Sequence, residues 1–251
     1  MRALARERGI DLAQAAGTGP GGAVTRADVE RAAEARRATA AGEPLKGVRR
    51  AMAINMARAH AEIVPATVWD EADIEPWWSP RADVSVRLIR AIGAACSAVP
   101  ALNAWFDGKS MARQLWPHVD LGIAVETEDG LIVPVLRDIA NRDAPAIRRD
   151  LDALKGAARA RTVALADLRD PTITLSNFGT LAGRQAALVV VPPQVAIVGA
   201  GRIAPRAVPH DNGVAFRHML PLSITFDHRV VTGGEVALFL KAMIEDLQRQ
   251  S

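Results

Sequence analysis

The stretch SITFDHRVVTGGEVALFLKAMIEDLQ, residues 223–248, combines a strand, a tight turn and a helix. Its first part is an apolar run that ends at His228, and the Gly-Gly pair at 233–234 permits a turn. Apolar residues then recur at helical spacing, which predicts a final helix with one apolar face: Val236, Phe239, Leu240, Met243, Ile244 and Leu247. This order places the imidazole of His228 at the end of a strand.

Residues 46–251 are predicted to form one domain in which strands and helices alternate without a regular βαβ rhythm. The predicted strands are ATVWDEADI (66–74), two strands about the turn EDG within 119–138, PTITLSNFG (171–179), PQVAIVGAG (193–201) and the run that ends at His228. The predicted helices are 48–60, 84–100, 144–160 and 234–248. This pattern indicates an α+β fold with a mixed β-sheet.

Residues 1–33 are predicted to form a small helical module. A short helix is stopped by Gly9, a glycine-rich loop follows, and a second helix begins at Thr25. Asp28 stands three residues after Thr25, as in a relative of the capping box. A module of this length buries little apolar surface, so we expect it to serve as a docking domain. The Ala-rich residues 34–45 are predicted to form a linker.

Charge is distributed unevenly along the chain. Residues 1–60 contain 11 Lys/Arg and 6 Asp/Glu, a net charge of +5, while the remainder contains 20 and 22. Because the first aromatic residue is Trp69, no aromatic side chains accompany the basic ones, and a protein partner is favoured over nucleic acid. No apolar run is long enough for a membrane span and no secretory signal is visible, so a cytoplasmic location is expected. Cys96 is the only cysteine, and the histidines lack metal-ligand spacing, so we expect no disulfide and no metal site.

Two polar side chains at strand ends are candidates for catalysis. The imidazole of His228 has an ordinary pKa near neutrality, which suits it to deprotonate a thiol or an alcohol. The hydroxyl of Ser176, in TLSNFG, would suit donation to a developing oxyanion. Each has a simpler interpretation, as a hydrogen-bonded structural histidine and as a strand-ending turn residue. The residues by themselves leave both interpretations open.

Five runs of the sequence resemble one protein family. PLSITFDHRVVTGG, TITLSNFGT, PPQVAIVGAGRI and VDLGIAVETEDGLIVPVLRD resemble the catalytic domain of the dihydrolipoamide acyltransferase component of 2-oxo acid dehydrogenase complexes, a distant relative of chloramphenicol acetyltransferase. LARERGIDLAQAAGTGPGGAVTRADVERA resembles the peripheral-subunit-binding domain of the same component. The resemblance implies a chloramphenicol-acetyltransferase-like mixed sheet flanked by helices, after a docking domain that binds a protein partner.

The resemblance also implies roles for individual residues. In the family signature H-x-x-x-D-G, His228 matches the general base and Gly233 the glycine. Ser176 matches the serine that hydrogen-bonds the tetrahedral oxyanion. The family uses coenzyme A or its acyl thioester as co-substrate and no metal. Its active sites lie between neighbouring subunits of a trimer, so a trimer-based homo-oligomer is expected.

The sequence departs from the family pattern in three places. Thr232 stands at the aspartate of the signature, where we expect a hydrogen-bonded turn in place of an ion pair. Trp77 and Trp78 lie in a shortened segment and are candidates for an altered acceptor entrance, with loop packing as the alternative. No run resembles a lipoyl attachment site, so no lipoyl domain is expected in this chain.

Three functions are compatible with these features of the sequence. The first is a stand-alone acetyl-CoA-dependent acyltransferase that O-acetylates a small-molecule hydroxyl in natural product biosynthesis, with a tetronate-type acceptor. The second is the acyltransferase core of a 2-oxo acid dehydrogenase complex, which acts on dihydrolipoamide. The third is a scaffold whose signature has decayed at Thr232. The absent lipoyl domain and the altered segment around Trp77 favour the first, so the sequence predicts an O-acetyltransferase.

Overall fold

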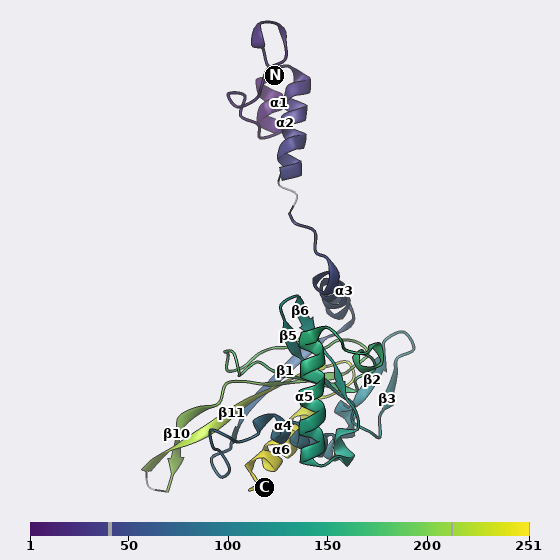
Figure 1. Cartoon of the computed structure of the whole chain (residues 1–251), viewed down its shortest axis with the longest axis vertical. Coiled ribbons are helices and arrows are strands. Elements are labelled where there is room, and N and C mark those ends of the chain that lie inside the picture. The colour runs from purple at the N-terminus through teal and green to yellow at the C-terminus, as the bar shows by residue number, and fades with distance from the viewer. Residues whose placement is uncertain (40–41, 212, 251) are drawn as a thin grey trace. The chain divides into compact units, whose positions relative to one another are not determined.

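The computed structural model of the protein describes residues 1–39, 42–211 and 213–250 (Figure 1). The chain divides into two compact units, Met1–Lys46 and Gly47–Ser251. Each unit has its own source of stability.

The N-terminal unit contains helices α1 (Arg2–Glu7) and α2 (Arg26–Thr39), with a 3₁₀ turn at Pro20–Gly22. Helix α1 ends before Gly9, which adopts a φ of +63°. Helix α2 continues past residue 33, so the first part of the predicted linker is helical. Among the described residues of this unit, Ala5 and Val29 are the buried hydrophobic side chains. So small an apolar core leaves the unit dependent on polar contacts.

Those polar contacts centre on the buried carboxylate of Asp28. It accepts hydrogen bonds from the backbone N–H groups of Thr18 and Thr25, both at 2.9 Å, and from both threonine hydroxyls at 2.8 Å. The backbone N–H of Thr18, followed by that of Thr25, lowers the pKa of Asp28 well below its usual range. The backbone N–H of Asp28 donates to the hydroxyl of Thr25 at 3.3 Å, so the predicted relative of the capping box is confirmed.

The second unit is built on a mixed seven-stranded sheet of order β1-β11-β9-β8-β4-β7, in which β10 also pairs with β11. The β4–β8 and β8–β9 pairs are parallel and the other pairs are antiparallel. The strands are β1 (Pro65–Asp73), β4 (Leu121–Ile123), β7 (Val135–Leu136), β8 (Ile173–Asn177), β9 (Ala196–Ala200), β10 (Ala204–His210) and β11 (Gly213–Asp227). The predicted α+β class and mixed sheet are confirmed.

Two small hairpins accompany the sheet. One is formed by β2 (Ala104–Asp107) and β3 (Ala112–Leu115), and the other by β5 (Val125–Thr127) and β6 (Gly130–Ile132). The segment 119–138, predicted as two strands, contains four short ones. Ala124, whose N–H donates to the carbonyl of Leu175 of β8, lies between β4, in the main sheet, and β5, in the hairpin.

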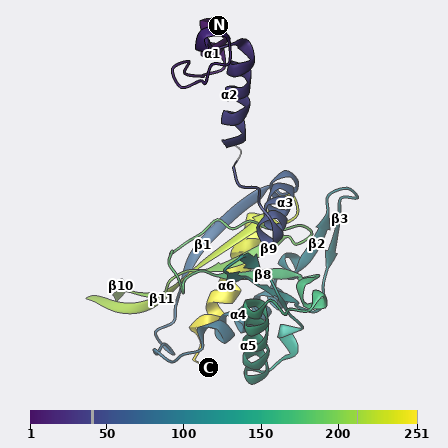
Figure 2. The same ribbon diagram turned by 45° about the horizontal axis from the view of Figure 1, so that its top comes forward.

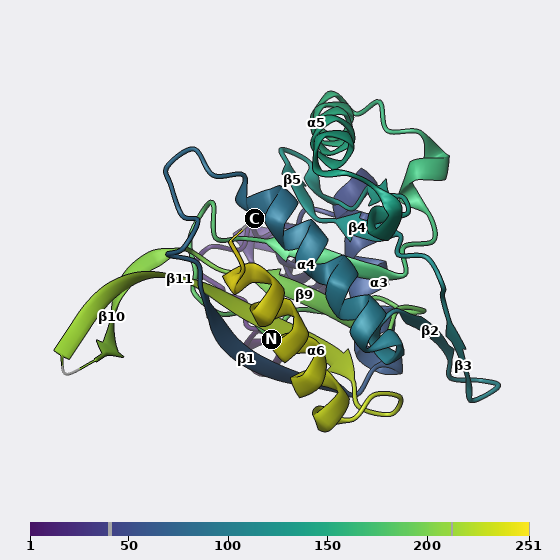
Figure 3. The same ribbon diagram turned by 90° about the horizontal axis from the view of Figure 1, so that it is seen from below.

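Helices α4 and α6 lie side by side against one face of the sheet (Figure 3). The helices of this unit are α3 (Gly47–Glu62), α4 (Val84–Ala98), α5 (Ala144–Ala160) and α6 (Gly233–Gln248), with 3₁₀ turns at Pro100–Leu102, Ile139–Asn141 and Leu165–Leu168. Helix α6 buries Val236, Phe239, Leu240, Met243 and Leu247. Each such side chain contributes about 1.5–3 kcal/mol by leaving water, so the predicted apolar face anchors the helix.

The opposite face of β9 and β11 is covered by residues 184–191, a segment without regular secondary structure that we call the strap. The N–H of Ala186 donates to the hydroxyl of Ser223 at 3.2 Å, and the N–H of Leu188 donates to that of Thr225 at 3.0 Å. The indole of Trp69 donates to the carbonyl of Ala186 at 3.4 Å. The strap therefore lies on side chains of the sheet, not on its edge.

The β10–β11 hairpin projects from the body of the sheet (Figures 1 and 2). At its base, both backbone groups of His218 point away from β10: the carbonyl accepts from Ile74 N–H at 3.0 Å, and the N–H donates to Glu75 at 2.7 Å. His218 and its partner on β10, Pro205, therefore form a non-hydrogen-bonded pair, and the nitrogen of Pro205 points away from β11, toward the outer edge of β10. The nitrogen of Pro209, four residues later on the same strand, points the same way.

Candidate active site

His228 follows the last residue of β11 and is fixed by its backbone. Its N–H donates to the carbonyl of Val64 at 2.9 Å, and the N–H groups of Val230 and Val231 close a turn on the carbonyl of Asp227. The ring of His228 is exposed and lies 5.3 Å from the ring of Phe226. The structure thus places the imidazole at a strand end, as the sequence predicts, where a second molecule can reach it.

An ion pair beneath this turn was not assigned a role from the sequence. The carboxylate of Asp227 is fully buried and accepts from Arg229 at 2.6 Å, and also from Val64 N–H at 3.3 Å. The adjacent side chain of Arg229 remains partly exposed. The carboxylate thereby ties the start of β1 to the turn that carries His228. The signal in the sequence was the Asp-His-Arg order, which puts opposite charges on both sides of the histidine.

Thr232 is the N-cap of α6. Its hydroxyl accepts from the N–H of Glu235 at 3.3 Å, while the carboxylate of Glu235 accepts from the N–H of Thr232 at 2.8 Å, which completes a capping box. That backbone donor lowers the pKa of Glu235. The hydrogen-bonded turn expected at Thr232 is present. Gly233, the first residue of α6, has no neighbour within 4 Å of an added Cβ.

Ser176 lies near the end of β8, next to Gly199 of β9, and is half-buried. It lines a cavity of about 530 Å³ whose wall is mainly apolar. Helix α3 contributes Val48, Met52 and Met56 to this wall. Of the two hydroxyls in this wall, that of Thr174 donates to Gln194 at 2.7 Å. The hydroxyl of Ser176 is suited to hydrogen-bond one polar atom of an otherwise apolar group.

Ser176 and His228 of one chain do not meet. Ser176 aligns with Ser223 of β11 through Gly199, two strand positions away, and His228 is five residues beyond Ser223. Strand spacing and rise put the two side chains roughly 20 Å apart, far beyond the 2.6–3.2 Å of a hydrogen bond. A site that uses both residues therefore needs a second copy of the chain.

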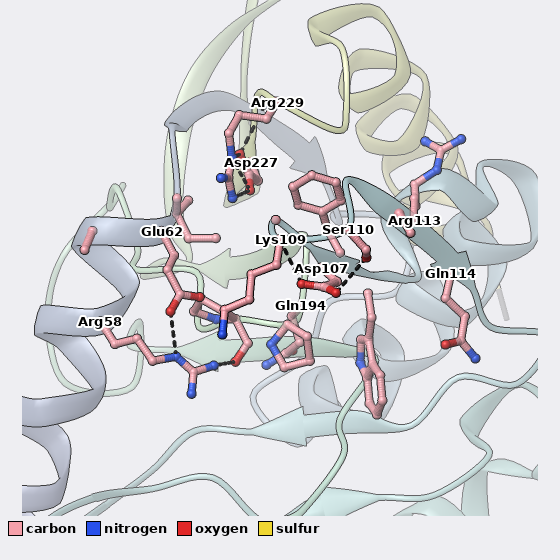
Figure 4. Close-up of a pocket in the computed structure, with 18 residues that line it drawn as sticks. Arg58, Glu62, Asp107, Lys109, Ser110, Arg113, Gln114, Gln194, Asp227 and Arg229 are labelled. Carbon is pink, nitrogen blue, oxygen red and sulfur yellow. Dashed lines mark hydrogen bonds and ion pairs between the residues drawn. The ribbon is translucent and has the colours of Figure 1, made fainter.

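A second, more polar cavity of about 710 Å³ lies beside the His228 turn (Figure 4). Arg58 pairs with Glu62 at 3.3 Å and donates to the carbonyl of Pro192 at 3.0 Å, while Lys109 and Arg113 come from the β2–β3 hairpin. It shares Pro192, Pro193 and Gln194 with the cavity of Ser176. The two cavities therefore lie on either side of one short segment.

Trp77 and Trp78 have packing contacts. The indole N–H of Trp77 donates to the carbonyl of Leu247, and Arg87 lies over its ring at 5.1 Å. The ring of Trp78 lies 5.0 Å from that of His218. This end of the β1–β11 pair is about 27 Å from the His228 end, so these contacts favour the loop-packing alternative. A role at the acceptor entrance stays a prediction.

No group of three or more His, Cys, Asp and Glu side chains within 1–39, 42–211 and 213–250 is arranged to hold a metal ion. Over the same residues, none of the helices has the length and apolar content that a membrane crossing requires. Cys96 is buried, and burial raises the pKa of its thiol.

Both units of the chain are similar to known protein families. The family of 2-oxoacid dehydrogenases acyltransferases (catalytic domain) matches residues 37–250, and the e3 binding domain matches residues 2–30. The lipoamide acyltransferase component of the branched-chain alpha-keto acid dehydrogenase complex of Pseudomonas aeruginosa is 32% identical over 97% of this chain. The alignment covers 63% of that relative, so the chain spans a little under two thirds of its length.

Solved structures agree with the fold. The cubic core of the pyruvate dehydrogenase multienzyme complex superposes with a TM-score of 0.79 at 25% identity, covering 82% of this chain and 90% of that one. Chloramphenicol acetyltransferase superposes with a TM-score of 0.52 at 17% identity, covering 78% and 94%, which shows the shared fold.

These relatives correct one expectation. The predicted O-acetyltransferase of natural product biosynthesis is wrong, because the similar proteins are acyltransferase components of 2-oxo acid dehydrogenase complexes. The altered segment around Trp77, which favoured that prediction, has packing contacts instead. The chain belongs to the 2-oxoacid dehydrogenase acyltransferase family, and its N-terminal unit matches the e3 binding domain.

Proposed function

We propose that this protein is the acyltransferase core of a 2-oxo acid dehydrogenase complex and moves an acyl group between dihydrolipoamide and coenzyme A. The observation that carries the proposal is the family match over residues 37–250, which includes both His228 and Ser176. The names of the relatives support dihydrolipoamide as the thiol substrate.

Proton transfer at His228 begins the proposed reaction. The imidazole takes the proton of the attacking thiol, and the thiolate adds to the carbonyl carbon of the acyl thioester. A new C–S bond forms while the carbonyl oxygen becomes an oxyanion, which the hydroxyl of Ser176 stabilises by donating a hydrogen bond. Collapse of the intermediate breaks the old C–S bond, and the leaving thiolate takes the proton back from His228.

The proposed site forms between copies of the chain. Because His228 and Ser176 of one chain are roughly 20 Å apart, the histidine of one copy acts with Ser176 of the partner subunit. A closed ring of identical contacts, such as a trimer, completes every site in this way. The exposed ring of His228 at the end of β11 supports this arrangement.

The N-terminal unit is proposed to bind a protein component of the same complex. The match to the e3 binding domain supports this role. The unit is rich in arginine, including Arg2, Arg6 and Arg8 of its first turns, which favours an acidic partner surface.

The test measures thiol release when purified protein is given acetyl-CoA and dihydrolipoamide. His228→Ala is expected to lower turnover by several orders of magnitude, because loss of the proposed base removes both proton transfer and activation of the thiol. Ser176→Ala is expected to lower it about 10²–10³-fold. Absence of transfer by the wild-type protein to dihydrolipoamide would contradict the proposal.

Mixing the two variants tests the shared site. Co-refolded His228→Ala and Ser176→Ala chains form some interfaces that contain an intact histidine from one copy and an intact serine from the other. Turnover of the mixture is expected to exceed that of either parent. A mixture no more active than its parents would place the whole site in one chain and overturn the proposed arrangement.

A further inference from the structure

A row of small residues crosses the sheet beside Ser176. In register with it lie Gly199 of β9 and Ser223 of β11, with Trp69 of β1 at the edge. Residues in register share a face of the sheet, so this row leaves a hollow where larger side chains would stand. An added Cβ at Gly199 would lie 2.9 Å from Cδ1 of Leu188. Cε1 of Phe178 would lie 3.2 Å from the same atom, so the side chains of Leu188 and Phe178 together fill the hollow next to Ser176.

The strap holds Leu188 in this position. Its N–H donates to the hydroxyl of Thr225 at 3.0 Å, and the N–H of Ala186 donates to that of Ser223 at 3.2 Å. Both hydroxyl-bearing residues are 1% exposed. Arg184 pairs with Glu71 of β1 at 3.0 Å and fastens the start of the strap. A half-buried side chain whose backbone is attached at these points has little freedom to move away from a bound group.

Leu188 is also part of the wall of the Ser176 cavity. Val48, Met56 and Ile197 line the same space, which is mainly apolar. A thioester whose carbonyl oxygen accepts from Ser176 must direct its acyl chain along such a wall, because the aliphatic chain has no polar group to satisfy. The carbons nearest the carbonyl then lie close to Leu188.

We propose that Leu188, presented by the strap, sets the length of the acyl chain that the Ser176 cavity accepts. The inference rests on the proposed acyltransferase function and adds to it a selectivity for the length of the acyl group. With the leucine in place, short aliphatic acyl groups are the favoured class. One methylene group more or less in an apolar pocket changes selectivity by about 10–200-fold, so a single leucine is large enough to decide it.

The experiment compares acyl-CoA substrates of increasing length. Initial rates with acetyl-, butyryl- and hexanoyl-CoA, each with dihydrolipoamide, give the ratio of kcat/KM for hexanoyl to acetyl. Leu188→Ala is expected to raise this ratio at least about tenfold, and Leu188→Phe to lower it. Leu181→Ala is the matched control, because Leu181 lies in the same connection, outside the strap, and is 71% exposed. An unchanged ratio in both Leu188 variants would overturn the proposal.

A binding measurement separates this inference from the proposed function. S-ethyl-, S-butyl- and S-hexyl-CoA thioethers have no carbonyl to attack, so calorimetry reports their affinity without turnover. If the wild-type protein transfers no acyl group but Leu188→Ala strengthens hexyl over ethyl binding at least about tenfold, the function fails and the length limit stands. If transfer occurs and neither rates nor affinities depend on residue 188, the length limit fails alone.

Thr225→Val tests whether the strap positions Leu188. The change keeps the volume of the side chain and removes the acceptor of the Leu188 N–H. The hexanoyl-to-acetyl ratio is expected to rise, by less than in Leu188→Ala. A variant with lower stability and an unaltered ratio would limit Thr225 to a structural role and remove the strap from the proposal.

Discussion

The two faces of β11 are equally buried, but one carries apolar side chains and the other carries hydroxyl groups. Leu222, Ile224 and Phe226 point to one face and join the core cluster that includes Phe239 of α6. The alternate residues Ser223 and Thr225 point to the other, and all are at most 1% exposed. An apolar face is filled by any helix with an apolar stripe. Buried hydroxyls need hydrogen-bond partners, and the strap supplies an N–H donor to each of these two.

This difference links the helix-covered face to the stability of the fold and the strap-covered face to the selectivity of the proposed reaction. The helix-covered face is stabilised by the apolar area that it removes from water. That contribution depends mainly on the size of the area and only weakly on which apolar side chains supply it. The strap-covered face depends on particular donors, and it lies beside Ser176. Changes on the first face are therefore expected to alter unfolding, and changes on the second to alter transfer.

The largest expected effect is on the helix-covered face. Phe239→Ala leaves a cavity at a fully buried position and is expected to lower the free energy of unfolding by about 3–5 kcal/mol. Urea denaturation followed by circular dichroism measures this change. Leu238→Ala, one residue away and 58% exposed, is the control and should stay within about 0.5 kcal/mol of wild type. Similar losses in both variants would contradict the comparison.

Ser176→Ala is the complementary change on the strap-covered face. Loss of the proposed oxyanion donor is expected to remove about 2.7–4 kcal/mol of transition-state stabilisation, while the urea midpoint stays that of the wild type. Steady-state rates and denaturation of the same preparation give both quantities. A shifted midpoint with unaltered turnover would reverse the roles assigned to the two faces.

Thr225→Val is expected to cost about 1–3 kcal/mol, because the N–H of Leu188 is left without its acceptor. The hydroxyl of Thr67, 2.9 Å from that of Thr225, also loses its partner. Amide hydrogen exchange should quicken at Leu188 and less at Ala186, whose acceptor is Ser223. Equal protection at Leu188 in variant and wild type would show that the strap is held by other contacts.

The smallest expected effect is at Thr232, where the helix-covered face meets the His228 turn. Thr232→Ala removes the N-cap of α6 and should lower the free energy of unfolding by about 0.5–2 kcal/mol. Thr232→Asp restores the residue expected from the family and should change stability little, because aspartate is an equally good N-cap. Thermal denaturation compares the two, and a large loss in the aspartate variant would indicate a second role for the threonine hydroxyl.

Much of the sheet and all four of the larger predicted helices were readable from the sequence. Periodicity is strongest where an element is buried, as in β8, β9 and α6, and those predictions agree with the structure within a few residues. Strand β10 was missed because Pro205 and Pro209 argue against a strand. Hairpin β2–β3 was missed because most of its side chains are exposed and carry little alternation.

The candidate site was only partly readable. Its residues come from short motifs, but the separation of Ser176 from His228 depends on strand order, which local patterns do not reveal. The contacts of the strap join residues 37 positions apart and follow no sequence period. One signal was present: Ser223 and Thr225 alternate with apolar residues in a buried strand, which indicates a face with its own polar partners.

The prolines of β10 have a consequence for behaviour at high concentration. The free edge of a long hairpin is a template onto which other strands can aggregate, and Phe216 on its face is 73% exposed. Along this edge, Pro205 and Pro209 remove two backbone donors and leave that of Ala207 between them. A strand of another molecule therefore cannot form a continuous ladder of backbone hydrogen bonds with this edge. The hairpin keeps an exposed apolar face while its edge is protected against uncontrolled fibre growth.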